Sequence, residues 1–328
     1  EKSRFLTQME IERKDVKHVI VSPKVTINSS ELQKIPKTDV VIEKLNKLAK
    51  KGFSPSALST YIYNPIDFYY QKILKIEEVN EVEETVAVNT MGTVIHETLE
   101  QLYKPFIGEF LTEASFKKMF SNVEYLVKEN FKKVYKNGDI SSGKNKLVFE
   151  VSKKQVNRFL HQELQEVKGG KQIKILGLEQ ELSSEIKIDN LNFPIKLHGI
   201  IDRIDQVDGV TRIVDYKTGM VQSNQLRMTD FSKMSDDYKY TKALQVMLYA
   251  HLYIEETSFD ISQPIEAGII SFKNLNSGFL KINFAEGRGK DYVFTEEKID
   301  EFLTELRRII TEIFNQEIPF LENPDKAF

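Results

Sequence analysis

The sequence predicts an α/β fold in which helices flank one central mixed β-sheet. Helical patterns dominate the first half of the chain, three strand-like segments follow, and a further helix separates them from later strands. This order of elements is typical of an α/β protein whose helices pack on a single sheet. The three central segments cover residues 173–188, 199–207 and 210–217.

Composition limits the class of protein and the cofactors it can hold. The 328 residues are 41% hydrophobic and 29% charged, which is enough apolar material for a large core. No segment approaches the roughly 20 apolar residues of a membrane helix. The chain has no cysteine, which excludes disulfides and thiolate-held zinc or iron–sulfur centres and fits a reducing, cytoplasmic location. It begins at Glu1, so we expect an excised part of a longer protein.

The first fifty residues read as an irregular lead-in. Within it we expect residues 21–29 to be extended and residues 37–52 to be helical, with Gly52 ending the helix. We place the boundary of the main domain here, so that 1–52 is a lead-in and 53–328 is one domain.

A pair of short helices is expected directly after this boundary. Ser54 is a good N-cap and Pro55 suits the first helical position. Asn64-Pro65 ends that helix, and a second short one follows. The acidic run 77–90 is expected to be a loop.

Residues 89–103 predict a strongly amphipathic helix that carries a histidine. Its apolar stripe consists of Met91, Val94, Ile95, Leu99 and Leu102. His96 follows Gly92 by one turn, so we expect open space above the imidazole. The next stretch, 114–168, is helical and polar.

A tight β-hairpin is predicted within "GIIDRIDQVDGVTRIVDYKTG", which starts at residue 199. Asp208-Gly209 is the turn, because Asp and Gly tolerate positive φ angles. Val207 then faces Val210, and this register places Asp202 opposite Asp215. The remaining elements are an irregular stretch at 218–238, a helix at 238–256, strands at 265–274 and 278–285, and a final helix at 295–318 capped by Thr295.

Two carboxylates and a lysine share one face of this hairpin. Asp202 and Asp215 would lie roughly 5 Å apart, where like charges destabilise a sheet unless something compensates them. Lys217 is two residues beyond Asp215 and therefore on the same face. Two hard carboxylates suit Mg²⁺ or Mn²⁺, which can lower the pKa of a bound water, and a nearby lysine can position or deprotonate that water. The alternative is an exposed hairpin with incidental charges, but apolar Ile213 and Val214 argue for a buried strand.

Charge is unevenly distributed along the chain. Residues 77–84 carry five acids, whereas residues 117–174 hold 14 Lys or Arg against six Asp or Glu. A basic stretch of this kind can follow a phosphate backbone, although a solvated helix face is equally consistent with it.

Four segments resemble the PD-(D/E)XK nucleases of the RecB type, especially the nuclease domain at the C-terminus of the AddB subunit of AddAB helicase–nucleases. They occur in the family's order across most of residues 53–255. The entry segment is "FSPSALSTYIYNPIDFYY", the histidine helix is "MGTVIHETLE", the hairpin is "GIIDRID…IVDYKTG", and the glutamine–tyrosine helix is "ALQVMLYAHLY". The initial "EKSRFLTQM" is similar to the link that leads into this domain. The resemblance implies a restriction-endonuclease-like core with an added N-terminal helical segment.

The resemblance also implies a role for each matching residue. The metal ligands would be His96, Asp202, Asp215 and the backbone carbonyl of Tyr216, and Lys217 would act on the attacking water. Gln245 and Tyr249, one helical turn apart, would line the site and hold the lysine or the DNA strand. The alternatives are a packed helix histidine for His96, and ordinary helix surface and core for Gln245 and Tyr249. Glu179 and Glu181 on the preceding strand are candidates for an acid behind the metal ligands.

One departure from the family concerns the iron–sulfur cluster that many relatives hold through a cysteine before Pro65 and three more near the C-terminus. Here Asn64 occupies the first position and no cysteine exists, so the sequence rules out the cluster. Packing of Tyr63, Phe68, Tyr69 and Tyr70 would secure the same segment instead.

We therefore expect an Mg²⁺- or Mn²⁺-dependent deoxyribonuclease of exonuclease type, acting in double-strand break repair and recombination. Its DNA would be single-stranded and delivered by an AddA-like helicase subunit, with no membrane involved. The aromatic segment 61–70 and the basic region 117–174 would guide the strand. The alternatives are a catalytically silent DNA-binding or scaffolding module, which the complete set of site residues argues against, and a metal-dependent hydrolase acting on RNA or nucleotides.

Overall fold

The computed structural model describes residues 3–13, 32–76, 88–135, 140–235 and 237–325. Contacts divide the chain into two units, residues 1–32 and 33–328, which are described separately. The first unit contains helix α1 (Arg4–Glu12), whose start is capped by the Ser3 hydroxyl. The irregular lead-in expected at 1–50 did not anticipate this helix, and the extended segment expected at 21–29 lies outside the described residues.

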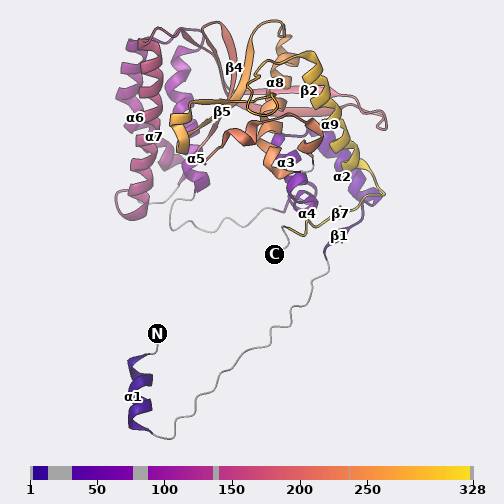
Figure 1. Cartoon of the computed structure of the whole chain (residues 1–328), viewed down its shortest axis with the longest axis horizontal. Coiled ribbons are helices and arrows are strands. Elements are labelled where there is room, and N and C mark those ends of the chain that lie inside the picture. Colours follow the sequence, from indigo (N-terminus) through magenta and orange to yellow (C-terminus); the bar gives the residue numbers. More distant parts are fainter. Residues whose placement is uncertain (1–2, 14–31, 77–87, 136–139, 236, 326–328) are drawn as a thin grey trace. The chain divides into compact units, whose positions relative to one another are not determined.

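The second unit is built on a mixed sheet of five strands in the described chain, in the order β2-β3-β4-β5-β6 (Figure 1). These strands are β2 (Ile173–Ile186), β3 (Ile195–Val207), β4 (Val210–Lys217), β5 (Ile265–Ser271) and β6 (Phe279–Lys281). β4 and β5 are parallel, and the other neighbouring pairs are antiparallel. A separate two-stranded sheet joins β1 (Lys34–Ile35) to β7 (Phe320–Leu321). The expected α/β fold with a mixed central sheet is confirmed.

Helices flank this sheet. The α-helices are α2 (Asp39–Lys51), α3 (Pro55–Tyr63), α4 (Pro65–Phe68), α5 (Val88–Tyr103), α6 (Glu113–Val134), α7 (Gly143–Lys168), α8 (Thr241–Thr257) and α9 (Glu296–Phe314). Shorter helical segments are η1 (Tyr69–Ile73), η2 (Lys104–Phe106), η3 (Ser223–Leu226), η4 (Phe231–Met234), η5 (Tyr238–Tyr240) and η6 (Phe272–Ser277).

Several helix ends follow the sequence signals. Gly52 ends α2 with φ 116°, a conformation that glycine adopts without strain. The Ser54 hydroxyl accepts a hydrogen bond from the Ala57 amide, and Pro55 occupies the first helical position of α3. Thr295 caps α9 in the same way. These predictions are confirmed because capping depends on residues that are close in sequence.

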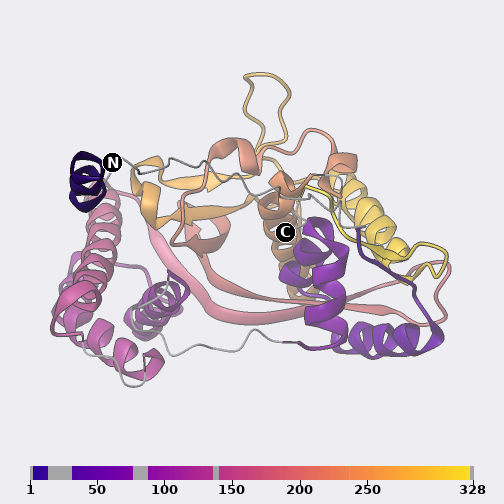
Figure 2. The same ribbon diagram turned by 90° about the horizontal axis from the view of Figure 1, so that it is seen from below.

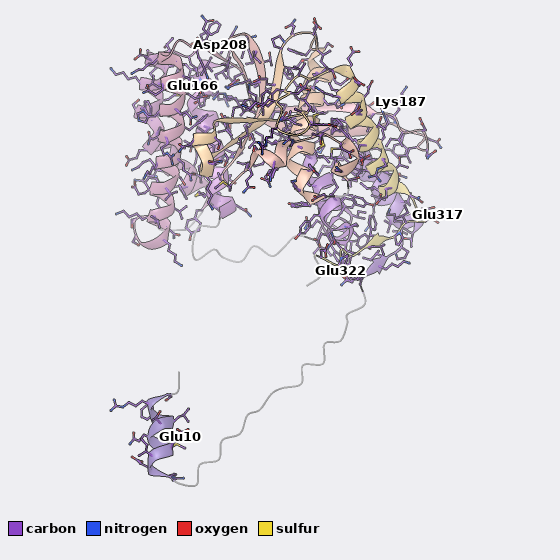
Figure 3. The ribbon with its side chains drawn as sticks, in the orientation of Figure 1. Glu10, Glu166, Lys187, Asp208, Glu317 and Glu322 are labelled. Carbon is purple, nitrogen blue, oxygen red and sulfur yellow. The ribbon has the colours of Figure 1, made fainter. Side chains whose placement is uncertain are left out.

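Two hydrophobic cores lie on opposite faces of the sheet, and strand alternation decides which residue enters which. Val214 and Ile270 pack with α5, α6 and α7, whereas Ile213 and Ile269 pack with α2, α3, α8 and α9. Figure 2 shows the long strands β2 and β3 running between these two groups of helices. In Figure 3, Asp208 and Lys187 mark opposite ends of this long strand pair.

The central hairpin has the predicted turn and register. Asp208 and Gly209 have φ angles of 52° and 85°, and Val207 pairs with Val210. The paired residues continue to Arg203 and Val214, so Asp202 and Asp215 are the next residues beyond the last pair. Both carboxylates therefore lie where β3 and β4 begin to separate.

Three expected boundaries were wrong. Residues 88–90 belong to α5, so within the described chain the acidic loop does not extend to residue 90. The strand expected at 265–274 ends at Ser271, where η6 begins, whereas the stretch 114–168 is helical as expected, in α6 and α7. The strand expected at 278–285 keeps only three residues, because the Asn283 backbone pairs with Leu226 and Met228 instead of the sheet.

Candidate active site

The site begins at the point where β3 and β4 separate. The Asp202 carboxylate accepts a hydrogen bond of 2.5 Å from the backbone amide of Tyr216. This side-chain bond takes the place of the next rung of the strand ladder. It holds one carboxylate of the hairpin at the fork between the strands, against the backbone amide of Tyr216.

Helix α5 brings His96 to the same place. Its Nδ1 lies 3.4 Å from Oδ1 of Asp202, and its ring meets the Tyr216 ring edge-on. The expected open space above the imidazole is partly filled: a Cβ on Gly92 would lie 3.4 Å from the Thr218 hydroxyl. Thr218, just after β4, therefore lies within ordinary van der Waals distance of this turn of α5, next to the histidine.

Strand β2 supplies a third ligand-type group, Glu179. Its neighbours Leu178 and Gln180 pair with Arg203 and Ile201, so the register places Glu179 opposite Asp202. Its φ of 43° is unusual for a residue other than glycine and points to a local function. Donor atoms of His96, Glu179 and Asp202 all lie within 4.8 Å of one another, a set of hard oxygens and one imidazole that fits a divalent cation.

Asp215 forms the second half of the site with three of the predicted residues. Its carboxylate lies 2.8 and 2.9 Å from the Lys217 ammonium, and the Gln245 amide donates to it at 3.0 Å. The same Gln245 amide donates to the Tyr249 hydroxyl at 2.9 Å. A Cβ on Gly199 would lie 2.6 Å from the Tyr249 ring, so this glycine allows α8 to lie against β3. The structure thus brings all the predicted side chains into one region.

Electrostatics explain which groups carry protons. Burial raises the pKa of Asp215 to about 6, and the charge of Asp202 adds to this while Lys217 opposes it. Burial alone disfavours the Lys217 ammonium, but Asp215 outweighs it and raises the pKa of the lysine. Lys217 is therefore a cation at neutral pH.

The group formed by His96, Glu179 and Asp202 has too little positive charge to balance its two carboxylates. Burial raises the pKa of Glu179 to about 7, with a further contribution from the Asp202 charge that His96 only partly offsets. Burial disfavours the His96 imidazolium, but the hydrogen bond and charge of Asp202 raise its pKa overall. The charge of Asp202 thus favours the protonated forms of both Glu179 and His96, as expected for a site that takes up a cation.

A surface cavity of about 530 Å³ opens onto this group. It is lined by Gly92, Thr93, His96, Glu97, Glu100 and Glu179. A larger cavity of about 650 Å³ lies between α2, the β2–β3 connection and the end of α9, away from these residues. The candidate ligand group therefore opens onto the smaller and more acidic of these two cavities.

The opposite face of the hairpin carries a buried network of charges. Arg203 is fully buried and pairs with Asp205 at 2.6 Å and with Glu163 of α7 at 2.8 Å. It also donates to the Tyr216 hydroxyl at 3.3 Å. Arg212 makes two bonds of 2.7 Å to Asp205, and the two guanidinium groups lower the pKa of that carboxyl although burial opposes this.

The regions expected to guide a DNA strand contain both buried and half-buried aromatic residues, and several of their lysines are ion-paired. Tyr61 and Phe68 are buried and pack edge to face, so they stabilise the fold, whereas Tyr63 is half-buried against Tyr238. The basic excess of 117–174 lies on α6, α7 and the start of β2. Several of its lysines are in ion pairs, namely Lys132, Lys133, Lys153, Lys168 and Lys171.

Sequence reasoning did not decide between Glu179 and Glu181. Alternation alone would place both on one face of a strand, and they are distinguished by the pairing with β3 and by the positive φ of Glu179. The local signal was limited to two acids on the strand before the hairpin. Lys242 was not selected at all, and it lies on α8 one turn before Gln245.

Comparison with known proteins identifies the class of protein that this fold and site define. A model of the PD-(D/E)XK nuclease superfamily matches residues 52–325, and the chain belongs to this superfamily. This span contains all the site residues described above.

Two similar proteins come from Rickettsia species. An uncharacterized protein from Rickettsia conorii is 26% identical over 212 residues, which covers 61% of this chain and 23% of that protein. An uncharacterized protein from Rickettsia felis is 28% identical over 179 residues, or 51% of this chain and 19% of that protein. The matches thus span about a quarter or less of each relative. Among the described residues, none of the helices is sufficiently long and apolar to span a bilayer.

Proposed function

We propose that this chain is a divalent-metal-dependent deoxyribonuclease domain that hydrolyses phosphodiester bonds. The observation that carries the proposal is the convergence of two groups from four elements. His96, Glu179 and Asp202 form a ligand set, and the bonded pair Asp215 and Lys217 lies beside it on the hairpin. Membership of a nuclease superfamily supports the same reaction class.

The cation would be Mg²⁺ or Mn²⁺, held by His96, Asp202, Asp215 and the Tyr216 carbonyl, with Glu179 next to them. Carboxylate and carbonyl oxygens suit these hard ions, and the excess of negative charge favours a divalent one. A bound cation supplies an activated water and neutralises charge on a phosphoryl oxygen. No iron–sulfur cluster is proposed, because the chain has no cysteine.

Lys217 would orient the attacking water and stabilise the developing negative charge. In the free protein Asp215 raises the pKa of the lysine, and an ammonium can donate a hydrogen bond to the water or to a phosphoryl oxygen. Gln245 donates to Asp215 and so holds the carboxylate toward the lysine. Tyr249 in turn holds Gln245, which makes both residues positioning groups.

The biological setting we propose is a RecB- or AddB-like helicase–nuclease in double-strand break repair and recombination, with exonuclease action. The four sequence motifs in the family's order support this setting. Single-stranded DNA would come from an AddA-like helicase subunit, in the cytoplasm. The proposed domain boundary, a lead-in at 1–52 followed by a nuclease domain at 53–328, belongs to the same proposal.

The deciding experiment compares this chain with its Lys217→Ala variant on labelled single- and double-stranded DNA and on RNA, in Mg²⁺, Mn²⁺ or EDTA. We expect metal-dependent DNA cleavage that the variant loses. Lys281→Ala is a matched control. Lys281 is also a strand lysine paired with a carboxylate, that of Glu266 on β5 at 2.6 Å, but it lies on β6 and not on the hairpin. It should keep full activity.

The alternatives give different results in the same assay. Cleavage of RNA in preference to DNA would favour a ribonucleolytic hydrolase. Binding of DNA without cleavage, together with no Mn²⁺ binding by calorimetry, would favour the silent scaffolding module and contradict the proposal.

A further inference from the structure

Helix α8 presents a cation beside the site that the proposed chemistry does not use. Lys242, Gln245 and Tyr249 occupy positions i, i+3 and i+7, so they share one face of α8. Gln245 on that face bonds to Asp215 at 3.0 Å. Lys242 is therefore one turn away from a residue in direct contact with the site.

The charge of Lys242 is poorly compensated in the free protein. It is half-buried, and the Lys217 ammonium is near enough to repel it. The nearby Asp215 carboxylate is already bonded to Lys217 and Gln245. Within the described chain no carboxylate forms an ion pair with Lys242. An anionic phosphate placed between the two lysines would relieve this repulsion.

The other side of the site is lined by carboxylates. The cavity next to His96 has the side chains of Glu97, Glu100 and Glu179 in its wall, of which Glu97 pairs with Lys133 at 3.0 Å and Glu100 with Lys104 at 3.4 Å. A strand with one phosphate at the metal ligands therefore meets carboxylates, two of them ion-paired, on the α5 side and Lys242 on the α8 side. The lysine favours a path toward the start of α8.

An aromatic side chain lies at this same turn. Tyr238 belongs to η5, which leads directly into α8, and it is 49% exposed. Its ring packs edge to face on Tyr63, with centroids 4.7 Å apart at 65°. Lys242 is four positions after Tyr238, which corresponds to about 6–8 Å along the helix axis. A ring held by a neighbour and exposed on its other side is suited to stacking on an unpaired base.

We propose that the turn entering α8 is a binding subsite for single-stranded DNA, in which Lys242 binds the phosphate next to the cleaved one and Tyr238 stacks on a base. This inference rests on the proposed nuclease function and adds the residues that would select a single strand. A base in a duplex is already stacked and paired, so the tyrosine contact is available only to an unpaired strand.

The first test measures binding of a fluorescent single-stranded 20-mer in EDTA by anisotropy at several salt concentrations. We expect Lys242→Gln to weaken binding about five- to tenfold and to reduce the magnitude of the logarithmic salt slope by about 0.7, the loss of one phosphate contact. Lys239→Gln is the matched control, because Lys239 lies in the same turn but over the Tyr240 ring. Equal losses in both variants would overturn a specific role for Lys242.

The second test uses steady-state cleavage. A contact made equally in the bound and transition states raises KM and leaves kcat unchanged, so Lys242→Gln should raise KM with kcat within about twofold. Lys242→Arg should restore binding. A fall in kcat with unchanged KM would overturn the assigned role.

The third test addresses the tyrosine. Tyr238→Ala should weaken single-strand binding at least about fivefold and leave duplex binding unchanged, whereas Tyr238→Phe should keep wild-type affinity. Equal losses for single strand and duplex would contradict the stacking role. Melting temperatures confirm that each variant is folded.

The outcomes separate this inference from the proposed function. If the wild type cleaves DNA and Lys242→Gln binds it normally, the subsite is wrong and the nuclease assignment stands. If the wild type neither binds nor cleaves DNA, both fall.

Discussion

The two faces of the β3–β4 hairpin are both rich in charge, yet they differ in how that charge is compensated. On one face Arg203, Asp205 and Arg212 form a closed network with α7 that is almost fully buried. On the other face burial and the charge of Asp202 raise the pKa of Asp215, and His96 and Glu179, which lie beside Asp202, line a surface cavity. Neighbouring residues along one strand therefore serve opposite purposes.

The difference shows how a site can be strained locally without weakening the fold. Breaking a closed buried network leaves an uncompensated charge, which costs stability. Removing a carboxylate from the open face relieves repulsion, so it costs activity instead. Substitutions on the two faces should thus separate stability from catalysis.

The largest effect is expected on the closed face. Arg203→Met removes the partner of Glu163 and one of the two partners of Asp205, and it should lower the free energy of unfolding by about 3–5 kcal/mol. Urea unfolding followed by circular dichroism measures this. Asp202→Asn, which removes one of the repelling carboxylates of the open face, is the control and should cost far less. Similar losses for both would remove the contrast between the faces.

The next effect concerns activity on the open face. Asp202→Asn should lower the cleavage rate at least about a hundredfold, because even groups behind metal ligands are typically worth 10- to 100-fold. Its melting temperature in EDTA should stay equal to that of the wild type or rise, since one of several repelling carboxylates is gone. A large fall in melting temperature would show that Asp202 is a structural residue.

A smaller effect is expected in the pH dependence of stability. Folding raises the pKa of Glu179 to about 7 from 4.5, so the folded protein binds the proton more tightly than the unfolded chain. The stabilisation of the folded state by the proton on Glu179 is fully present below about pH 4.5 and is lost as the pH rises to 7. In EDTA, Glu179→Gln should match the wild type at pH 4.5 and exceed its stability at pH 8.

Mn²⁺ should reverse this difference at pH 8, because the cation compensates the carboxylate only in the wild type. Denaturant titrations across the pH range provide the measurement. A difference between the two proteins that does not change with pH would contradict the role of the Glu179 charge.

The smallest effect is expected at Tyr216, which belongs to both faces. Its side chain accepts from Arg203 at 3.3 Å on the closed face, while its backbone amide bonds to Asp202 on the open one. Tyr216→Phe should cost about 0.5–1.5 kcal/mol of stability and change the cleavage rate less than about twofold. A large loss of activity would mean that the Tyr216 hydroxyl influences catalysis through the buried charge network of the closed face.

Much of the fold was predictable where the determining residues are close in sequence. The turn at Asp208 and Gly209, the register of the hairpin and the caps at Ser54 and Thr295 all depend on short patterns. The mixed sheet followed from the order of elements. The prediction of a strand at 278–285 was wrong about its end, because Asn283 pairs with the distant residues Leu226 and Met228, and no local sequence pattern predicts that pairing.

The candidate site was predictable in its residues but not in its arrangement. The hairpin face and the motifs selected His96, Asp202, Asp215, Lys217 and Gln245, which the structure brings into one region. That Glu179 rather than Glu181 joins the ligand set depends on the pairing of β2 with β3.

The sequence by itself determined the hairpin, because alternation and turn chemistry are local properties of consecutive residues. It also determined which side chains were available for chemistry. Only the tertiary structure decided which of them meet. A shift of one residue between Ile175 and Gly177 sets Glu179 opposite Asp202, and the packing of α8 on Gly199 brings Lys242 beside Lys217. These are contacts between distant segments, and only the packed fold specifies them.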